Sequence, residues 1–338
     1  MPIRHRSTIL VSILSLLISC MLLLSACGSS TTTGGGNATP APGTKNLSIG
    51  LGYLADIQFA PFYVAQSKGY YKAAGLNVTF NQGIVPNLIG SMIAGKNDFV
   101  FAGGDETLQA RDKNVKVVDV STIFQKYPVS LIVPASSSIK TLADIKGHTI
   151  GVPGPYGSTY TGLLALLYSA KLSPSDVHVQ SIGFTQVAAL AGHKVDAVMG
   201  YSNNEPLQLQ RQGFAVHTFN VSDYQPLVSN GIITTEDTFQ KQPQMVRDFV
   251  QATLKGLKDV IANPSEAVTL CKPFIPGLTD TAQTLTKLKA TILVWQSDKQ
   301  LGYNDSATWD SMAKFLVAQK IIASGQDVTQ AYSNKSVV

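Results

Sequence analysis

Cysteine is scarce in this sequence of 338 residues, which holds only Cys20, Cys27 and Cys271. Cys20 and Cys27 lie near the amino terminus, so Cys271 is alone in the remainder and no intramolecular disulfide is expected there. The five histidines are far apart, and no HExxH, paired-cysteine, Walker-type or GxSxG motif occurs. The sequence therefore predicts no metal site and no cofactor.

Charge is also sparse: charged residues make up 14% of the chain, and the formal net charge is only +5. Lysine and arginine do not cluster on any segment with helical or strand periodicity. Proteins that bind nucleic acid need a basic face to neutralise phosphates. We therefore expect no nucleic-acid partner.

The amino terminus has the composition of an export signal. Basic residues at positions 4–6 precede a long apolar run over residues 9–24, which is the order found in secretory signals. The run ends in "LLSAC", where small residues precede Cys27, and this resembles the bacterial lipobox. The resemblance implies that residues 1–26 are a signal peptide and that Cys27 carries lipid.

The next residues are rich in Gly, Ser, Thr and Pro and poor in apolar side chains: "GSSTTTGGGNATPAPGTK". This composition is typical of a flexible linker. We therefore expect residues 27–45 to form a disordered tether that holds an extracytoplasmic domain beside the cell membrane. An uncleaved membrane helix is the alternative, and the polar stretch that follows the apolar run disfavours it.

From residue 46 onward, strand-like runs alternate with helix-like runs. "NLSIGLGY", "LNVTFNQG", "NDFVFAGG" and "VKVVDVSTIF" have the pattern of strands, and "HTIGVPG", "VHVQSIGF" and "VDAVMGY" continue the series. The carboxyl-terminal part predicts helices at residues 243–263, 264–272, 280–295 and 306–319. This alternation predicts an α/β fold with mainly parallel sheets.

Two successive α/β blocks predict two lobes joined by two crossovers. We place the crossovers in the extended segments 130–134 and 227–233, so that residues 46–133 and 232–338 form lobe one and residues 134–231 form lobe two. Open α/β sheets bind ligands beyond the carboxyl ends of their strands. Two facing lobes would therefore place both of these edges on one cleft.

Four stretches resemble a known family: "DIQFAPFYVAQSKGYYKAAGLNV", "AGKNDFVFAGGDE", "DIKGHTIGVPGPYGSTY" and "GHKVDAVMGYSNNEP". They are similar to the substrate-binding proteins of ABC importers, most of all to binders of thiamine pyrimidine precursors, with relatives for riboflavin, taurine and alkanesulfonates. The resemblance covers residues 47–323. It implies a periplasmic-binding-protein-like fold with a hinge and a cleft, and a membrane permease and an ATPase as partners. We expect a monomer.

One branch of this family is enzymatic. The fungal pyrimidine synthases use a cysteine-rich motif and a sacrificial histidine. Cys271 alone offers no such cluster. We therefore expect a binding protein and not an enzyme.

The segment "ADIQFAPFY" follows the first predicted strand, where the family places ligand contacts. Phe59 and Phe62 are candidates to stack on a flat ring, and Asp56 is a candidate acceptor for a ring N–H. The alternative for Phe62 is the core face of the helix.

The segment "GGDE" places Asp105 and Glu106 at the start of a helix. Asp105 either caps that helix or, like Glu106, reaches a donor on the ligand. An anionic ligand would be repelled by two carboxylates in a low-dielectric cleft, so the pair favours a neutral heterocycle with N–H donors. Tyr127, which precedes the first crossover, either stacks on the ligand or packs at the hinge.

The segment "GVPGPYGSTY" ends a strand and starts a helix. Free N–H groups at a helix start attract carbonyl, phosphate or sulfonate oxygens. A capped turn alone would explain the glycine and the serine but not the two tyrosines. The candidate ligand contacts are Tyr156, Gly157, Ser158, Thr159 and Tyr160.

The segment "GYSNNEP" repeats this arrangement after another strand. Its candidates are Tyr201, Asn203, Asn204 and Glu205. Asparagine offers a donor and an acceptor, which match the amide-like edges of pyrimidines and flavins, whereas Glu205 either contacts the ligand or complements the helix dipole.

The sequence thus predicts a lipid-anchored solute-binding protein that closes on a planar nitrogen heterocycle. A flavin and a thiamine pyrimidine are both compatible with these residues. An alkanesulfonate or taurine is the alternative ligand, and an enzyme of the pyrimidine-synthase type is the alternative activity.

Overall fold

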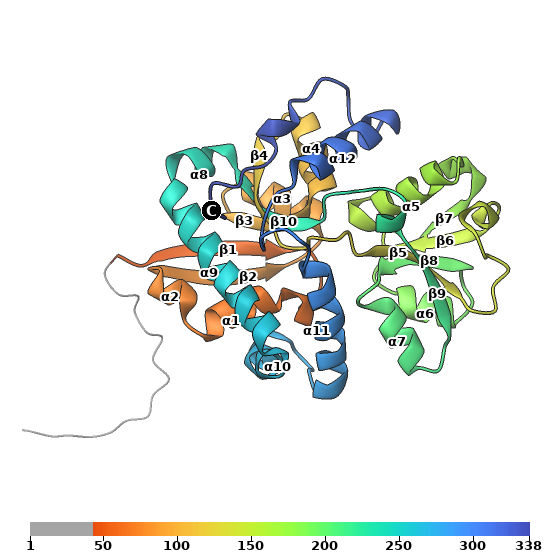
Figure 1. The fold of residues 1–338 in the computed structure, drawn as a ribbon, viewed down its shortest axis with the longest axis horizontal. Coiled ribbons are helices and arrows are strands. Elements are labelled where there is room, and N and C mark those ends of the chain that lie inside the picture. Colours follow the sequence, from red (N-terminus) through yellow and green to blue (C-terminus); the bar gives the residue numbers. More distant parts are fainter. Residues whose placement is uncertain (1–42) are drawn as a thin grey trace, which may run out of the picture. The chain divides into compact units, whose positions relative to one another are not determined.

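The computed structural model describes residues 43–338 as two five-stranded sheets surrounded by helices (Figure 1). The predicted signal peptide, the proposed lipidation site Cys27 and most of the predicted tether lie outside the described residues. No helix among residues 43–338 is both long enough and apolar enough to cross a membrane.

The first sheet has the strand order β2-β1-β3-β10-β4. Its strands are β1 (Lys45–Leu51), β2 (Leu76–Gln82), β3 (Phe99–Gly103), β4 (Val117–Thr122) and β10 (Asn230–Thr235). Pairings β1–β2 and β1–β3 are parallel, whereas β10 is antiparallel to both β3 and β4. The central strand β3 is buried along its whole length, which is why it is a continuous run of apolar and small residues. Strand β4 at the edge of the sheet is also buried throughout, including Asp119.

The second sheet repeats this design, with the order β7-β6-β8-β5-β9. Its strands are β5 (Val129–Pro134), β6 (Thr149–Val152), β7 (His178–Ser181), β8 (Ala197–Tyr201) and β9 (Val216–Asn220). Again one strand, β5, is antiparallel to its neighbours β8 and β9, and β6 pairs in parallel with β7 and β8. In each sheet the antiparallel strand is the first one that the chain enters after crossing from the other sheet.

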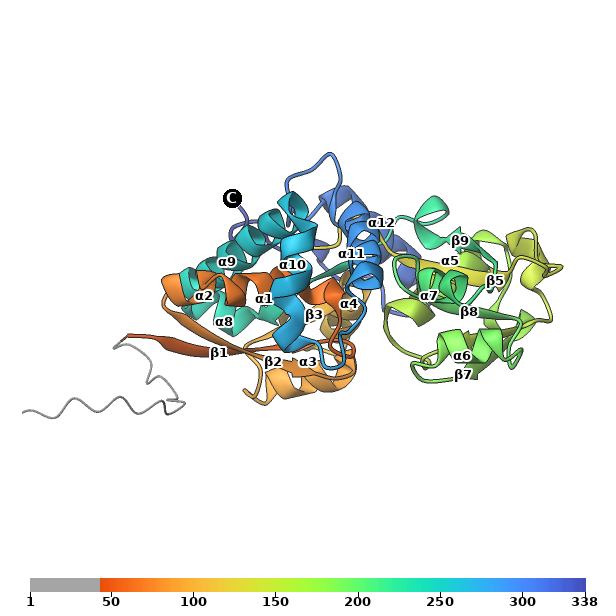
Figure 2. The ribbon, with the colours of Figure 1, turned by 90° about the horizontal axis from the view of Figure 1, so that it is seen from below.

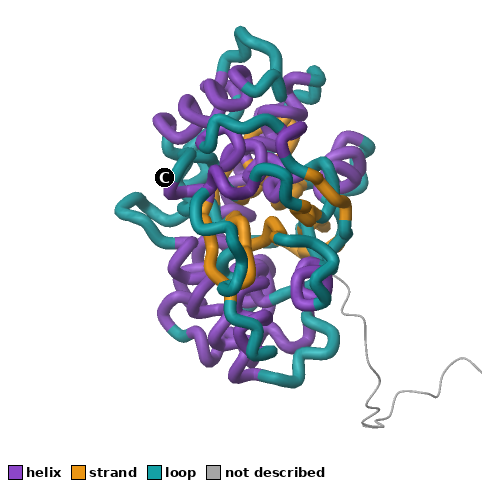
Figure 3. The backbone as a smooth tube through the Cα atoms, turned by 90° about the vertical axis from the view of Figure 1, so that its right-hand side faces the viewer, coloured by secondary structure: helices purple, strands orange, loops and turns teal. Residues whose placement is uncertain are grey.

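Helices cover both faces of each sheet, as Figure 3 shows with the strands between them. The helices of the first half are α1 (Ala60–Ser67), α2 (Tyr70–Ala73), α3 (Val85–Ile93), α4 (Gly104–Asp112), α5 (Gly157–Ser169), α6 (Gln186–Ala191) and α7 (Glu205–Arg211). The carboxyl-terminal helices are α8 (Glu236–Lys241), α9 (Pro243–Ala262), α10 (Pro264–Cys271), α11 (Thr281–Trp295) and α12 (Ser306–Ala318). The last four agree with the four predicted helices to within one residue at each end.

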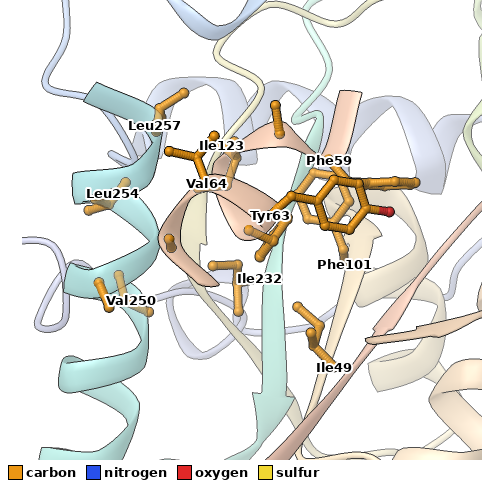
Figure 4. Packing of buried hydrophobic residues seen from close by; sticks show 14 of the residues in the cluster. Ile49, Phe59, Tyr63, Val64, Phe101, Ile123, Ile232, Val250, Leu254 and Leu257 are labelled. Atoms are coloured by element: carbon orange, nitrogen blue, oxygen red, sulfur yellow. The ribbon is translucent and has the colours of Figure 1, made fainter. Parts of the chain in front are cut away.

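The apolar core of the first lobe lies between the first sheet and helices α1 and α9. In Figure 2, α1, α2, α9 and α10 lie on one side of β1 and β2, and α3 lies on the other side. A side chain at Gly256 of α9 would collide with the carbonyl oxygen of Pro61, so a glycine is needed where the two helices approach. Figure 4 shows Val250 and Leu254 of α9 on the side of this core away from Phe59.

The crossovers lie earlier than we predicted from the sequence. Strand β5 pairs only with strands of the second sheet, so the chain has already crossed before Val129, within residues 123–128. The return lies within residues 221–229, because β10 starts at Asn230 in the first sheet. Residues 130–134 were expected to be a connection because an extended apolar run looks the same in a crossover and in a buried strand.

Helix α12 packs against both lobes. Its buried side chains, including Trp309 and Phe315, belong to the same apolar cluster as Leu163 and Leu167 of α5 and Leu108 of α4. The Phe315 ring also lies 5.7 Å from that of Tyr168. The described residues, 43–338, accordingly belong to one compact unit that contains both lobes.

Candidate functional site

A cavity lies where the carboxyl ends of strands from both sheets face each other. Its enclosed free volume is about 90 Å³. The lining residues are Gly52, Tyr53, Gln58, Phe59, Ile84, Val85, Phe101, Glu106, Pro153, Tyr156, Gly157, Ser158, Thr159, Phe184, Gln186, Tyr201, Asn204, Glu205 and Asn230.

Aromatic rings from both lobes form the apolar part of this lining. Tyr53, just after β1, meets Phe184, just after β7, edge to face with ring centroids 5.0 Å apart. Behind them, Phe59 of the short 3-10 helix η1 (Ile57–Phe59) packs edge to face on Phe101 of β3 at 5.9 Å. Tyr156 at the start of α5 is 36% exposed and lies at the edge of the cavity. Rings at these positions are suited to contact a flat ligand.

The start of α5 brings its backbone to the cavity. Gly157 has a φ of +72°, which only glycine adopts without strain. A Cβ at this position would lie 3.4 Å from Glu106 Oε1, so the two lobes approach closely here. No side chain caps α5, because its N-cap residue Tyr156 makes no capping hydrogen bond. Its first N–H groups therefore receive no hydrogen bond from the residue that precedes the helix.

Two adjacent buried acids of α4 face this helix start. The Gly103 N–H donates to Glu106 Oε2 at 2.9 Å, and the Ser158 hydroxyl of α5 donates to Asp105 Oδ1 at 3.2 Å. Burial, and then the charge of Asp105, raise the pKa of Glu106 to about 8. Burial also raises the pKa of Asp105. At neutral pH Glu106 is therefore largely protonated and can donate a hydrogen bond.

A third acid, Glu205, stands at the first position of α7. Its Oε2 accepts from the Tyr201 N–H at 2.7 Å and its Oε1 from Asn204 Nδ2 at 3.0 Å. Burial raises the pKa of Glu205, while the charge of Lys287 opposes this shift. The hydroxyl of Tyr201 donates to Asn230 Oδ1 at 3.1 Å and thereby joins β8 to β10 of the other lobe.

Six of the residues predicted for the site lie outside the lining, and each has another role in the fold. Asp56 caps η1 and pairs with Lys287 Nζ at 2.5 Å. Phe62 is fully buried against Phe101, which matches its alternative as a core residue. Asp105 lies behind Glu106 and is fully buried.

The other three belong to the packing between and within the lobes. The hydroxyl of Tyr127 donates to the Ser158 carbonyl at 2.7 Å, so Tyr127 packs at the crossover. Asn203 Nδ2 donates to Thr291 Oγ1 of α11 at 2.8 Å. Tyr160 packs against the apolar core of the second lobe. Sequence patterns alone do not separate such contacts from ligand contacts.

Several lining residues were not predicted, although their positions in the sequence could have indicated them. Gly52, Tyr53, Pro153 and Phe184 each follow the carboxyl end of a parallel strand, the position at which α/β sheets bind ligands. Asn230 has no such signal, because it lies at the amino-terminal end of the antiparallel strand β10.

No group of three or more His, Cys, Asp or Glu side chains within residues 43–338 is arranged to hold a metal ion. Cys271 is buried at the end of α10 and is not part of the lining. Neither a metal centre nor a cysteine-based site therefore accompanies the cavity in the described part of the chain.

Comparison with protein families matches residues 56–267 to the NMT1/THI5-like family. The chain belongs to this family. It is 35% identical over 341 residues to the riboflavin-binding protein RibY of Chloroflexus aurantiacus, covering 96% of this chain and 97% of RibY. This relative matches nearly the full length of both proteins, and so includes every element that lines the cavity.

More distant relatives have other names. A 4-amino-5-hydroxymethyl-2-methylpyrimidine phosphate synthase of Legionella pneumophila is 25% identical, covering 84% of this chain and 90% of the synthase. The formylaminopyrimidine-binding protein of Halalkalibacterium halodurans is 26% identical, covering 76% of this chain and 77% of that protein. Both binding proteins and enzymes thus occur among the family members that resemble this chain.

Among solved structures, the alkanesulfonate-binding protein SsuA from Xanthomonas axonopodis pv. citri, bound to MOPS, superposes with a TM-score of 0.70. It is 17% identical to this chain, and the match covers 87% of this chain and 99% of SsuA. This similarity shows the fold, which is the two-lobed periplasmic-binding-protein fold that the sequence predicted.

Proposed function

We propose that this protein binds a small, planar nitrogen heterocycle and delivers it to an ABC importer. The observation that carries the proposal is the composition of the cavity. Aromatic rings from both lobes form its walls, and its polar groups are carboxyl, amide and hydroxyl groups, with no Lys, Arg or His among the lining residues of the described chain. Flat rings with N–H and carbonyl groups on their rim match this arrangement.

Riboflavin is our first candidate and a thiamine pyrimidine precursor is the second. The near full-length similarity to a riboflavin-binding protein supports the first, and the similarity to a formylaminopyrimidine-binding protein supports the second.

Titration of the purified protein with riboflavin, hydroxymethylpyrimidine and taurine tests this proposal. We expect riboflavin fluorescence to be quenched on binding and the melting temperature to rise with ligand concentration. Binding of taurine with no response to either heterocycle would instead favour the alternative, an alkanesulfonate or taurine carrier.

We propose a carrier and not an enzyme. The one cysteine of the described residues, Cys271, is buried away from the cavity, and burial raises its pKa far above the ordinary value, which makes it inert. Mass spectrometry after incubation with ligand distinguishes the two activities. A carrier returns the ligand and its own histidines unchanged, whereas a synthase of this family type would show product or a modified histidine.

We also propose that the protein is anchored outside the cytoplasm through lipid on Cys27. The basis is the order of charged residues, apolar run, small residues and cysteine at the amino terminus. Replacement of Cys27 by Ser should release the protein from the membrane fraction, and intact mass should show the diacylated cysteine in the unsubstituted protein.

A further inference from the structure

Three helices that begin at the cavity already have a carboxyl group at their amino-terminal end. Helix α4 has Asp105 and Glu106 in its first turn, and α7 begins with Glu205. At α5 the acids come from the other lobe, since Asp105 accepts from the Ser158 hydroxyl and Glu106 Oε1 lies against Gly157. Helix starts attract anions, so these carboxyl groups occupy positions that a ligand phosphate or sulfonate would otherwise take.

We propose that Asp105 and Glu106 make this cavity selective for uncharged ligands, because they fill the amino-terminal end of α5 and so exclude phosphate esters and sulfonates of the same compounds. This inference rests on the proposed function and narrows it from a heterocycle to an uncharged heterocycle. In particular, it predicts that the free flavin binds and that its phosphate ester does not.

The fold provides space for the two acids. Any side chain at Gly103, the last residue of β3, would collide with the carboxylate of Asp105 and the hydroxyl of Ser158. Gly157 of the opposite lobe lies in contact with Glu106. Gly103 therefore permits the acids to lie between β3 and α5, and neither acid is a loosely placed surface group.

The carboxyl groups of the pair are incompletely satisfied, and that of Glu106 lines the cavity. Among the described residues, Asp105 Oδ2 is buried without a hydrogen-bond partner. Glu106 uses Oε2 to accept from Gly103, while Oε1 has no partner in the same part of the chain, and Glu106 lines the cavity at 8% exposure. A ligand carbonyl or ring nitrogen that accepts from the protonated Glu106 would satisfy this group. A phosphate would instead bring a negative charge that no cationic side chain of the lining balances.

Nothing in the described lining compensates an anion. Lys287, whose charge lowers the pKa of Glu205, is already paired with Asp56 at 2.5 Å. The remaining helices that contribute to the lining, α3 and α6, begin with apolar or amide side chains and bring no cationic side chain to it. An anionic group would thus enter without a positively charged side chain beside it, which is unfavourable in a buried site.

The test compares dissociation constants for matched pairs of ligands: riboflavin with riboflavin 5′-phosphate, and hydroxymethylpyrimidine with its phosphate. Since an anion buried without a positively charged partner costs several kcal/mol, we expect the phosphate esters to bind at least about 100-fold more weakly than the parent compounds. The variant Glu106→Ala, which vacates the α5 start, should reduce this ratio at least about tenfold. Glu266→Gln, a substitution of an exposed acid outside the cavity, is the matched control and should leave the ratio unchanged.

The outcomes separate this inference from the proposed function. Equal binding of a parent compound and its phosphate by the unsubstituted protein would overturn the selectivity and leave the heterocycle carrier intact. An unchanged ratio in Glu106→Ala would overturn the role of Glu106. Binding of taurine without binding of either heterocycle would overturn both proposals. If Glu106→Ala does not fold, the ratio measured on the unsubstituted protein still decides the selectivity.

Discussion

The two walls of the cavity differ in how firmly the fold holds them. On the first lobe, Phe59 and Phe101 are 2% and 3% exposed and are part of the main apolar core. On the second lobe, Tyr156 and Phe184 are 36% and 39% exposed and extend from turns that follow strands. The first wall is therefore a preformed surface, and the second wall consists of side chains whose burial must come from the ligand or from the opposite lobe.

This contrast suits a protein that closes on its ligand by hinge motion. A rigid surface receives one face of a flat ring, and the exposed rings of the second lobe gain contact area only when the lobes meet. The edge-to-face contact of Tyr53 with Phe184 across the cavity is one such contact. Substitutions on the first wall should therefore reduce stability, and substitutions on the second wall should reduce affinity.

The largest expected effect is on the pH dependence of stability, through Glu106 on the first wall. Because its pKa rises from 4.5 to about 8 on folding, the folded state binds more protons than the unfolded state between these values. The free energy of unfolding should therefore fall as pH rises from about 5 to about 8 and level off above that. At about 1.4 kcal/mol per unit, the change attributable to this residue is several kcal/mol.

Urea unfolding of the ligand-free protein at pH 5, 7 and 9 measures this effect. The variant Glu106→Gln keeps the shape of the protonated acid and should show a much flatter profile. Asp105 and Asp119, whose pKa values burial also raises, retain their part of the slope in both proteins. Parallel profiles for the two proteins would contradict the assignment of the raised pKa to Glu106.

The next effect is on stability alone. Phe101→Ala removes a ring that contacts both Phe59 and Phe62, and the densely packed β3 leaves the space unfilled. We expect a loss of about 3–5 kcal/mol in the free energy of unfolding, as for large-to-small changes in cores. Chemical denaturation measures it. A loss below about 1 kcal/mol would show that the first wall is not the rigid surface that its burial indicates.

The third effect is on affinity. Phe184→Ala removes an exposed ring, so stability should change by less than about 0.5 kcal/mol. Ligand affinity should fall up to about tenfold, because one aromatic contact contributes roughly 0.5–1.5 kcal/mol. Tyr224→Ala, which removes a similarly exposed ring of the return crossover outside the cavity, is the control and should bind normally. Equal affinities for both variants would remove Phe184 from the binding surface.

These walls also show how far the sequence determines the site. The alternation of strands and helices is a local property, so it predicted the α/β fold and the four carboxyl-terminal helices. The rule that ligands bind beyond strand ends led to Tyr156, Ser158 and Asn204, which line the cavity. It would also have led to Tyr53 and Phe184 if it had been applied to every parallel strand.

The sequence could not predict pairings between distant segments. Asp56 is a residue type that often contacts ligands. Its carboxylate charge is, however, neutralised by Lys287 of α11, which lies 231 positions away in the sequence. Asn203 and Asn204 are neighbours of the same type, yet Asn203 turns to Thr291 and Asn204 to the cavity. Only the packing of α11 between the lobes decides which of the two is available to a ligand.

The smallest expected effect concerns closure itself. The hydrogen bond from Asn203 Nδ2 to Thr291 Oγ1 connects the lobes at 2.8 Å and lies outside the cavity lining, so its loss should destabilise the closed state without removing a ligand contact. At roughly 1 kcal/mol for one such bond, Asn203→Ala should accelerate ligand release about fivefold in stopped-flow dissociation.

The partner variant Thr291→Val tests whether the bond is the cause. It should accelerate release to a similar extent, and the double variant should be no faster than either single one, since both changes remove the same interaction. Association rates should change little, because the open form that captures the ligand does not contain this bond. Fully additive effects in the double variant would mean that Asn203 and Thr291 act separately and that α11 does not hold the second lobe through this contact.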